Sequence, residues 1–206
     1  MRRTPARILL PILSGVTACL VVGGCGAVAA PGSTNPGPLR DTASGQRLRV
    51  TVAAGCPTSD SGMVGVTNEG SDLASQMLPS AQPTAGLLCG YDGLNGGAGL
   101  GGGGSTNGGA FTLESQKDLD AAAAQSLAQS VAQIPLGHGG GVVCSCPMAD
   151  GSAAVVVLSY PGRSDVDLWV LTNGCSSIAN GDLVLASCGS PAVAAIVTTI
   201  AVMVGE

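Results

Sequence analysis

The sequence has few aromatic, basic and histidine side chains. Its 206 residues include four aromatics (Tyr91, Phe111, Tyr160 and Trp169), eight Lys or Arg and a single His. Binding to nucleic acid needs clustered cations and commonly uses aromatic side chains as platforms for the bases. Both are scarce here, and the formal net charge is −5. Nucleic acid is therefore excluded as a partner.

The single histidine also limits the possible catalytic sites. A Ser-His-Asp triad could use only His138 as its base. His138-Gly139-Gly140-Gly141 resembles the oxyanion loop of lipases and esterases, but that loop works with a GxSxG elbow, which the sequence lacks. The segment Thr58-Ser59-Asp60-Ser61-Gly62 is similar to the nucleophile segment of serine proteases, yet no histidine precedes it. A hydrolase using His138 is the alternative hypothesis.

The first thirty residues have the pattern of an export signal. Arg2, Arg3 and Arg7 precede an uncharged, largely apolar stretch from Ile8 to Val22. This stretch is shorter than the roughly 20 apolar residues that span a membrane, and Pro11 interrupts it. We therefore expect a signal peptide over residues 1–24.

The end of this stretch resembles the lipobox of bacterial lipoproteins. Val22-Gly23-Gly24-Cys25 places small residues before a cysteine, to which diacylglycerol would be attached. Val16-Thr17-Ala18-Cys19 also matches, but Cys25 leaves a longer apolar region and is followed by Gly26. The alternative is an ordinary signal peptide cut near Ala30, with both cysteines removed. We expect lipidation of Cys25, with fatty acyl chains such as palmitate, and localisation at the outer face of the cell membrane.

The mature chain divides into a tether and one domain. Residues 25–46 contain three prolines among small polar residues, which predicts a disordered spacer. Residues 47–206 form the predicted domain, with a long glycine-rich loop at 93–109. From Cys25 onward the chain keeps five basic and thirteen acidic side chains, a net charge of 5 − 13 = −8. This charge excludes a polybasic hold on anionic lipid, so the membrane is a partner only through the lipid anchor.

Hydrophobic patterns in residues 47–206 predict an α+β fold. Period-two or continuous apolar runs indicate strands, and apolar stripes between capping signals indicate helices. The hairpin of 153–160 and 166–172 is expected at the centre of the sheet because 153–160 is apolar on both faces. The class is an antiparallel sheet of four to five strands with two packed helices, stapled by disulfides. The other predicted strands are 47–52, 85–91 and 183–187, with 142–146 as a candidate short strand. The two predicted helices are 111–134 and 191–204, with a candidate short helix at 72–78.

Six cysteines remain after Cys19 and Cys25: Cys56, Cys89, Cys144, Cys146, Cys175 and Cys188. An even number in an exported chain predicts three disulfides. The central hairpin would bring Cys146 and Cys175 to the same end, which predicts that pair. Cys56 with Cys89, and Cys144 with Cys188, follow by elimination.

Three other patterns contain residues that could form metal or acid–base sites. Cys144-Ser145-Cys146 near His138 could offer metal ligands, but zinc sites space their cysteines more widely. Asp165-Val166-Asp167 could be a metal-binding DxD, although a strand start with both carboxylates in solvent explains it better. Asp118 and Asp120, with Glu114, suit the start of the predicted helix. We expect no metal, no cofactor and no catalytic residue.

Several motifs in one order resemble a group of secreted and lipid-anchored actinobacterial proteins. The group carries an LCxY, a CPxxDG, a YPDG-type turn and a GCxxxxNG. The matching residues are Leu88-Cys89-Gly90-Tyr91, Ile134-Pro135 at a helix end, Cys146 to Gly151, Ser159-Tyr160-Pro161-Gly162, and Asn173-Gly174-Cys175 to Asn180-Gly181. This chain departs from the group in Cys144 and Cys188, in Gly90, where a basic residue is common, and in its glycine insertion. The resemblance implies location and fold rather than an activity.

The sequence thus predicts a non-enzymatic cell-envelope lipoprotein with a binding or structural role at the cell surface. It identifies neither a protein nor a small-molecule partner. A small-solute-binding lipoprotein is a further alternative, disfavoured because residues 47–206 would make a small two-lobed clamp.

Overall fold

The computed structural model describes residues 38–41, 46–61, 63–93, 110–137, 145 and 151–205. The predicted signal peptide, Cys19, Cys25, most of the glycine-rich loop, His138, and Cys144 and Cys146 lie outside these residues. The described part confirms the α+β class, with one large antiparallel sheet and two α-helices.

The main sheet has eight strands, more than the four to five expected. Every neighbouring pair in it is antiparallel. In spatial order the strands are β1 (Leu39–Arg40), β10 (Leu183–Ala186), β9 (Ser177–Ala179), β8 (Val166–Leu171), β7 (Ala153–Ser159), β5 (Ala85–Asp92), β6 (Ala110–Leu119) and β3 (Ser59–Ser61). A separate parallel pair joins β2 (Gln46–Leu48) to β4 (Met63–Val66).

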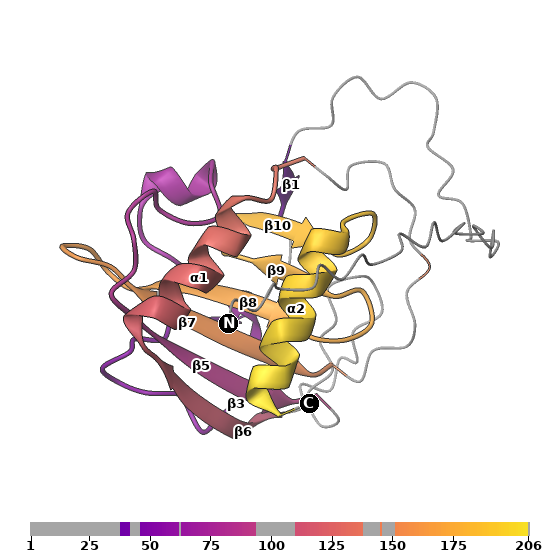
Figure 1. Ribbon diagram of the computed structural model, residues 1–206. Helices are drawn as coiled ribbons and strands as arrows, with labels where there is room; N and C mark the ends of the chain where they lie inside the picture. The colour runs from indigo at the N-terminus through magenta and orange to yellow at the C-terminus, as the bar shows by residue number, and fades with distance from the viewer. Residues whose placement is uncertain are drawn as a thin grey trace, which may run out of the picture.

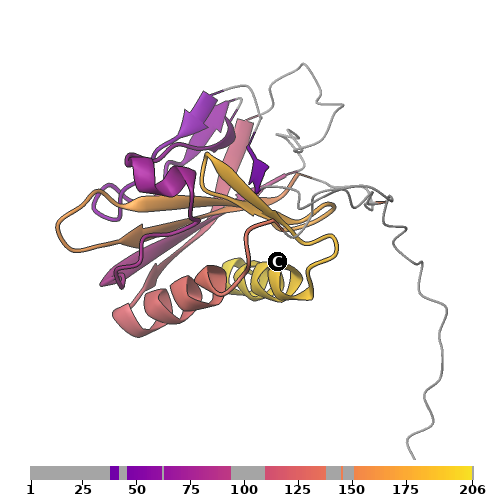
Figure 2. The same ribbon diagram turned by 90° about the horizontal axis from the view of Figure 1, so that it is seen from above.

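The two helices, α1 (Ala121–Ala132) and α2 (Pro191–Val204), lie side by side on one face of the sheet (Figures 1 and 2). N-terminal segments, coloured indigo to magenta, lie on the opposite side of the sheet, which Figure 2 shows nearly edge-on. The sheet is therefore covered on both faces, and each cover encloses a separate hydrophobic cluster.

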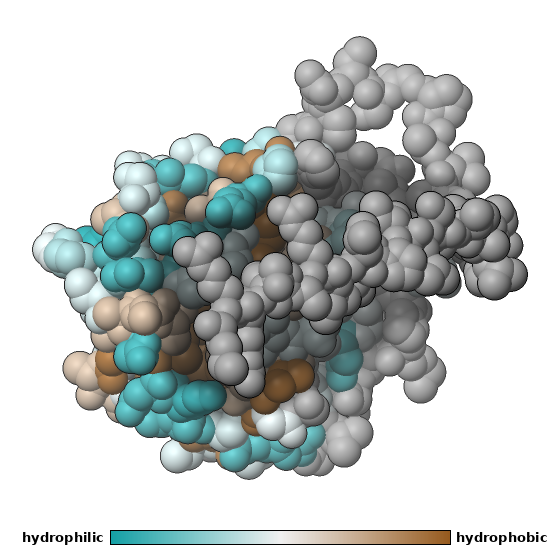
Figure 3. Space-filling model, in the orientation of Figure 1, coloured by the Kyte–Doolittle hydropathy of each residue, from teal (hydrophilic) through white to brown (hydrophobic). Residues whose placement is uncertain are grey.

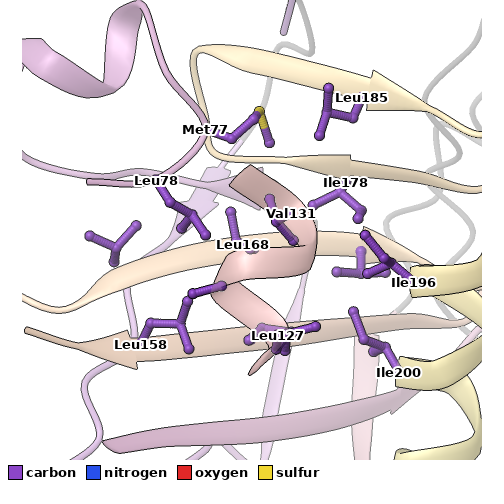
Figure 4. Close-up of a cluster of buried hydrophobic side chains, with 14 of the residues drawn as sticks. Met77, Leu78, Leu127, Val131, Leu158, Leu168, Ile178, Leu185, Ile196 and Ile200 are labelled. Atoms are coloured by element: carbon purple, nitrogen blue, oxygen red, sulfur yellow. The ribbon is translucent and has the colours of Figure 1, made fainter. Parts of the chain in front are cut away.

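The helix-side cluster is the larger of the two. Leu127 and Val131 of α1 and Ile196 and Ile200 of α2 point toward the sheet side chains between them (Figure 4). Met77 and Leu78 close one edge of this cluster, just after the 3-10 helix η1 (Ser71–Ala74). The sequence predicts a short helix at 72–78, and the structure has this single turn instead.

The predicted central hairpin is confirmed. Strands β7 and β8 pair along their length, and every residue of the hairpin strands from Ala153 to Leu158 and from Val166 to Leu171 is buried. Alternate residues of these strands belong to the two clusters, as an apolar strand in the middle of a doubly covered sheet requires.

Both helices begin at a residue whose side chain caps the first turn, and the cap of α2 is the one that the sequence predicts. Ser190 caps α2 by accepting the backbone N–H of Val193, and Pro191 follows at the first helical position. Asp120 caps α1 by accepting the backbone N–H of Ala123 at 2.8 Å. Neither helix contains a charged residue. The surface over them, seen in Figure 3, carries a hydrophobic patch at the C-terminal end of α2, where Val202 is exposed.

The predicted helix 111–134 is wrong in its first third. Residues 110–119 form β6, which pairs with β5 from Leu119 back to Thr112. Phe111 and Leu119 are buried in this strand, and Glu114 and Asp118 stand exposed on it rather than at a helix start. Sheet pairing with a distant segment outweighs the local helical pattern, so the helix begins only after the Asp120 cap.

Three further differences concern short strands. The predicted strand 47–52 is regular only as far as Leu48, although Leu48 and Val50 are buried and Val52 is half-buried against the same cluster as expected. Leu39–Arg40 pairs with β10, so the sheet includes residues from the range assigned to the tether. Strand β9 was not predicted, because its three residues are too few for a period.

Candidate functional site

Several buried or half-buried polar side chains form hydrogen bonds on the sheet face opposite the helices. Residues 49–58, which we call the strap, run across this face without regular strand structure. They lie over a cluster that contains Tyr91, Phe111 and Trp169, three of the four aromatic residues. Each of the three is at most 1% exposed.

The three aromatic rings make consecutive edge-to-face contacts. The ring of Phe111 stands at 89° to that of Trp169, with centroids 5.5 Å apart, and at 86° to that of Tyr91, 6.5 Å away. The Tyr91 hydroxyl donates to the backbone carbonyl of Pro57 in the strap at 3.2 Å. The aromatic cluster thus packs beneath the strap and is bonded to it.

A buried carboxylate lies beside this cluster. Asp167 of β8 is 1% exposed, and its Oδ2 accepts the backbone N–H of Val50 at 2.7 Å. Its Oδ1 has no hydrogen-bond partner within the described part of the chain. Burial raises the pKa of Asp167 to about 7, opposed by the Val50 hydrogen bond and the Arg49 charge and reinforced by the Asp165 charge.

The expectation that Asp165 and Asp167 both face solvent is therefore wrong. Asp165 is half-buried, and its Oδ2 accepts the backbone N–H of Val52 at 2.8 Å. Each of these carboxylates accepts a backbone N–H of the strap. Period two places Asp167 on the same face as Trp169, which could have identified it as buried once that face was known to be covered.

Two asparagines that were missed from the sequence complete the polar network. Asn68 donates through Nδ2 to the carbonyl oxygens of Asp167 and Asn180, at 2.8 and 2.7 Å. Asn180 is fully buried, and its Nδ2 donates to the carbonyls of Leu73, Gln76 and Met77. The sequence indicates only a turn at Asn180-Gly181. Nothing in the local pattern identifies the distant carbonyls to which Asn180 donates.

Arg47 forms a second junction at the start of the strap. Its Nη1 donates to Asp41 Oδ2 at 2.9 Å and to the carbonyls of Gly181 and Val66 at 2.8 and 3.2 Å. The Asp41 side chain is 1% exposed, so the pair is largely shielded from water. The guanidinium thereby joins three segments that are far apart in the sequence.

A disulfide fixes the other end of the strap. Cys56 and Cys89 are bonded across 33 residues of sequence, which confirms that predicted pair. Cys89 lies fully buried in β5. Cys175 and Cys188 each take part in a disulfide. Their predicted partners, Cys146 and Cys144, lie outside the described residues, so the pairs Cys146–Cys175 and Cys144–Cys188 stay predictions.

The other candidate residues are not brought together. The backbone places Ser59–Ser61 in the edge strand β3, paired with β6. Asp118 is exposed on β6, and Asp120 serves as the α1 cap. Within the described ranges no group of three or more His, Cys, Asp or Glu could hold a metal ion. The same ranges contain no helix with the length and hydropathy needed to cross a membrane.

Comparison with known proteins found no matching protein-family model, no matching curated protein and no matching solved structure.

Proposed function

We propose that this protein is an exported cell-envelope lipoprotein whose disulfide-braced domain has a binding or structural role rather than an enzymatic one. The observation that carries the proposal is the Cys56–Cys89 bond between the strap and the central strand β5. Disulfides persist in oxidising compartments and are rare where cytosolic thiol systems act. Cys175 and Cys188 are disulfide-bonded as well, which supports export of the chain.

The support for export and for a lipid anchor comes from the N-terminal sequence. The apolar stretch before Cys25 and the small residues that precede this cysteine support cleavage and lipidation there. Stable anchoring requires two or more acyl chains, because one chain binds a membrane only marginally. The tether after Cys25 would separate the domain from the bilayer. The motif order shared with secreted and lipid-anchored actinobacterial proteins agrees with this location.

The non-enzymatic part of the proposal rests on the fate of the polar residues. Two buried polar side chains bond to backbone groups of the same chain: Asp167 Oδ2 accepts the backbone N–H of Val50, and Asn180 Nδ2 donates to the carbonyl of Met77. Side chains bonded in this way hold segments of the chain together, which supports a binding or structural role.

Fractionation and mass spectrometry test the anchor. In the native bacterium the full-length protein should be in the membrane fraction, with diacylglycerol on an N-terminal Cys25. The variant Cys25→Ala should lose that lipid and leave the membrane fraction or remain unprocessed, whereas Cys19→Ala should behave like the unchanged protein. An unmodified mature N-terminus downstream of Cys25 would contradict the lipoprotein proposal.

Substitution of the single histidine tests the absence of enzymatic activity. His138→Ala should complement a deletion strain as fully as the unchanged gene, at equal protein level. Loss of complementation with normal folding and export would favour the hydrolase that uses His138.

A further inference from the structure

The strap is fixed at both ends and is attached differently between them. The Arg47 guanidinium holds its start against β4 and the turn at Gly181. The Cys56–Cys89 disulfide and the hydrogen bond from the Cys56 backbone N–H to Gln116 Oε1 hold its end. Between these points the backbone N–H groups of Val50 and Val52 donate to the side-chain carboxylates of Asp167, in strand β8, and Asp165, just before it.

This middle attachment differs from an ordinary strand pairing because its acceptors can change charge. Asp167 lies beneath the strap with Oδ1 lacking a partner in the described part of the chain. A buried carboxylate is far more costly as an anion than as a neutral acid unless its oxygens are fully hydrogen-bonded. Lifting the strap would let water reach the anion, so ionisation favours the open arrangement.

The surrounding charges do not cancel this cost. The positive charge of Arg49, in the strap, lowers the pKa of Asp167. However, Arg49 Nη1 also pairs with Glu69 Oε1 at 2.7 Å, and both residues are exposed to water. The charge of Asp165, just before this strand, raises the pKa of Asp167 further. The polar groups that reach Asp167 from the other side come from Asn68, which is neutral and bonds to its backbone. Val157, its partner on β7, is apolar.

We propose that residues 49–55 are a proton-controlled cover, seated on the sheet while Asp167 is protonated and lifting from it when Asp167 ionises, with Arg47 and Cys56 as fixed ends. The direction follows from the burial of Asp167 with Oδ1 lacking a partner in the described part of the chain, because the closed arrangement then disfavours the anion and binds the proton more tightly than the open one; the raised pKa of this group agrees. The cover therefore opens as the pH rises toward neutrality and above. Opening uncovers the sheet face at Asp167 and Trp169.

The chain contains its own reporter for this motion. Trp169 is the single tryptophan, lies two residues from Asp167 on the same strand face and is 1% exposed. When the pH of the protein with intact disulfides is raised from about 5 to about 8, the fluorescence emission of Trp169 should shift to the red. The Stern–Volmer constant for its quenching by acrylamide should increase. Asp167→Asn should keep the emission of the closed state throughout. Asp118→Asn, an exposed carboxylate on β6, should shift as the unchanged protein does.

Amide hydrogen exchange tests the same motion without any substitution. After correction for intrinsic exchange, the protection factor of the Val50 amide should fall by about tenfold or more over that range. Protection of the Val156 amide in the central strand β7 should stay constant. Equal burial of Trp169 at both pH values, the same shift in Asp167→Asn, or constant Val50 protection would overturn the proposal.

Discussion

Asn68 and Asp167 form a reciprocal pair in which one side chain takes the place of a neighbouring strand. The Asp167 backbone N–H donates to Asn68 Oδ1 at 2.7 Å, and Asn68 Nδ2 donates to the Asp167 carbonyl oxygen at 2.8 Å. The adjacent strand β9 pairs with β8 only from Trp169 onward. Asn68 therefore satisfies the backbone of β8 at the point where sheet pairing on that side stops.

Removal of this side chain should destabilise the domain. Asn68→Ala leaves the buried N–H and carbonyl of Asp167 without these partners, and each such group costs about 1–3 kcal/mol. We expect the free energy of unfolding to fall by about 2–4 kcal/mol, measured by urea denaturation at fixed pH. Gln129→Ala on the exposed face of α1 is the matched amide control and should change it little. A loss no greater than that of the control would contradict the pairing.

The raised pKa of Asp167 predicts an unusual dependence of stability on pH. Between the ordinary value of 3.8 and about 7 the folded chain binds a proton that the unfolded chain has released. The stabilising contribution of Asp167 to the free energy of unfolding is therefore fully present below about pH 4 and is lost as the pH rises to about 7. Its maximum is about 4 kcal/mol.

Denaturation at a series of pH values measures this contribution. Because the other carboxylates also titrate, the informative quantity is the difference between the unchanged protein and Asp167→Asn. The variant should gain stability relative to the unchanged protein as the pH rises from about 4 to about 7, and the gain should level off above that. A difference that is constant across this range would show that Asp167 has an ordinary pKa in the folded chain.

The Cys56–Cys89 disulfide should be a major contributor to stability. It closes a loop with a sequence separation of 33, which the chain-entropy model values at about 3–4 kcal/mol. The double variant Cys56→Ser/Cys89→Ser should lower the melting temperature sharply, as followed by circular dichroism. Deletion of half of the 93–109 loop should change it little, because loop-closure entropy varies slowly with length. The reverse order of effects would contradict this assignment.

The elements that the sequence predicts correctly are those whose signals lie close together along the chain. Ser190 and Pro191 mark the start of α2, and the apolar run of Ala153 to Leu158 marks a central strand, because the signals are local. Residues 111–119 were assigned to a helix because their pairing with β5 could not be seen in their own spacing.

The strap face was missed for the same physical reason. Asp167 was placed in solvent because its burial depends on the strap, which is 117 residues away at Val50. Asn68 and Asn180 join segments separated by 112 residues. Asn68 has no distinctive local pattern and Asn180 has only a turn dipeptide, whereas the Cys56–Cys89 pair was predictable by elimination among six cysteines.

A matched pair of glycines separates backbone strain from steric contact. Gly181 and Gly162 both have positive φ, +95° and +71°, where any other residue is strained. A Cβ on Gly181 would lie 2.6 Å from the carbonyl oxygen of Val66, a backbone atom, whereas one on Gly162 would meet nothing within 4 Å. Gly162→Ala should therefore show only the conformational cost of about 1 kcal/mol.

Gly181→Ala should cost more, because β4 and the turn at Gly181 must move apart. The carbonyls of Val66 and Gly181 both accept Arg47 Nη1, so this displacement would also loosen the junction at the start of the strap. We expect a loss larger than that of Gly162→Ala by about 1–3 kcal/mol, measured by urea denaturation. A greater acrylamide quenching of Trp169 should accompany it at about pH 5. Equal losses in the two variants would show that β4 and the Gly181 turn are not in close contact.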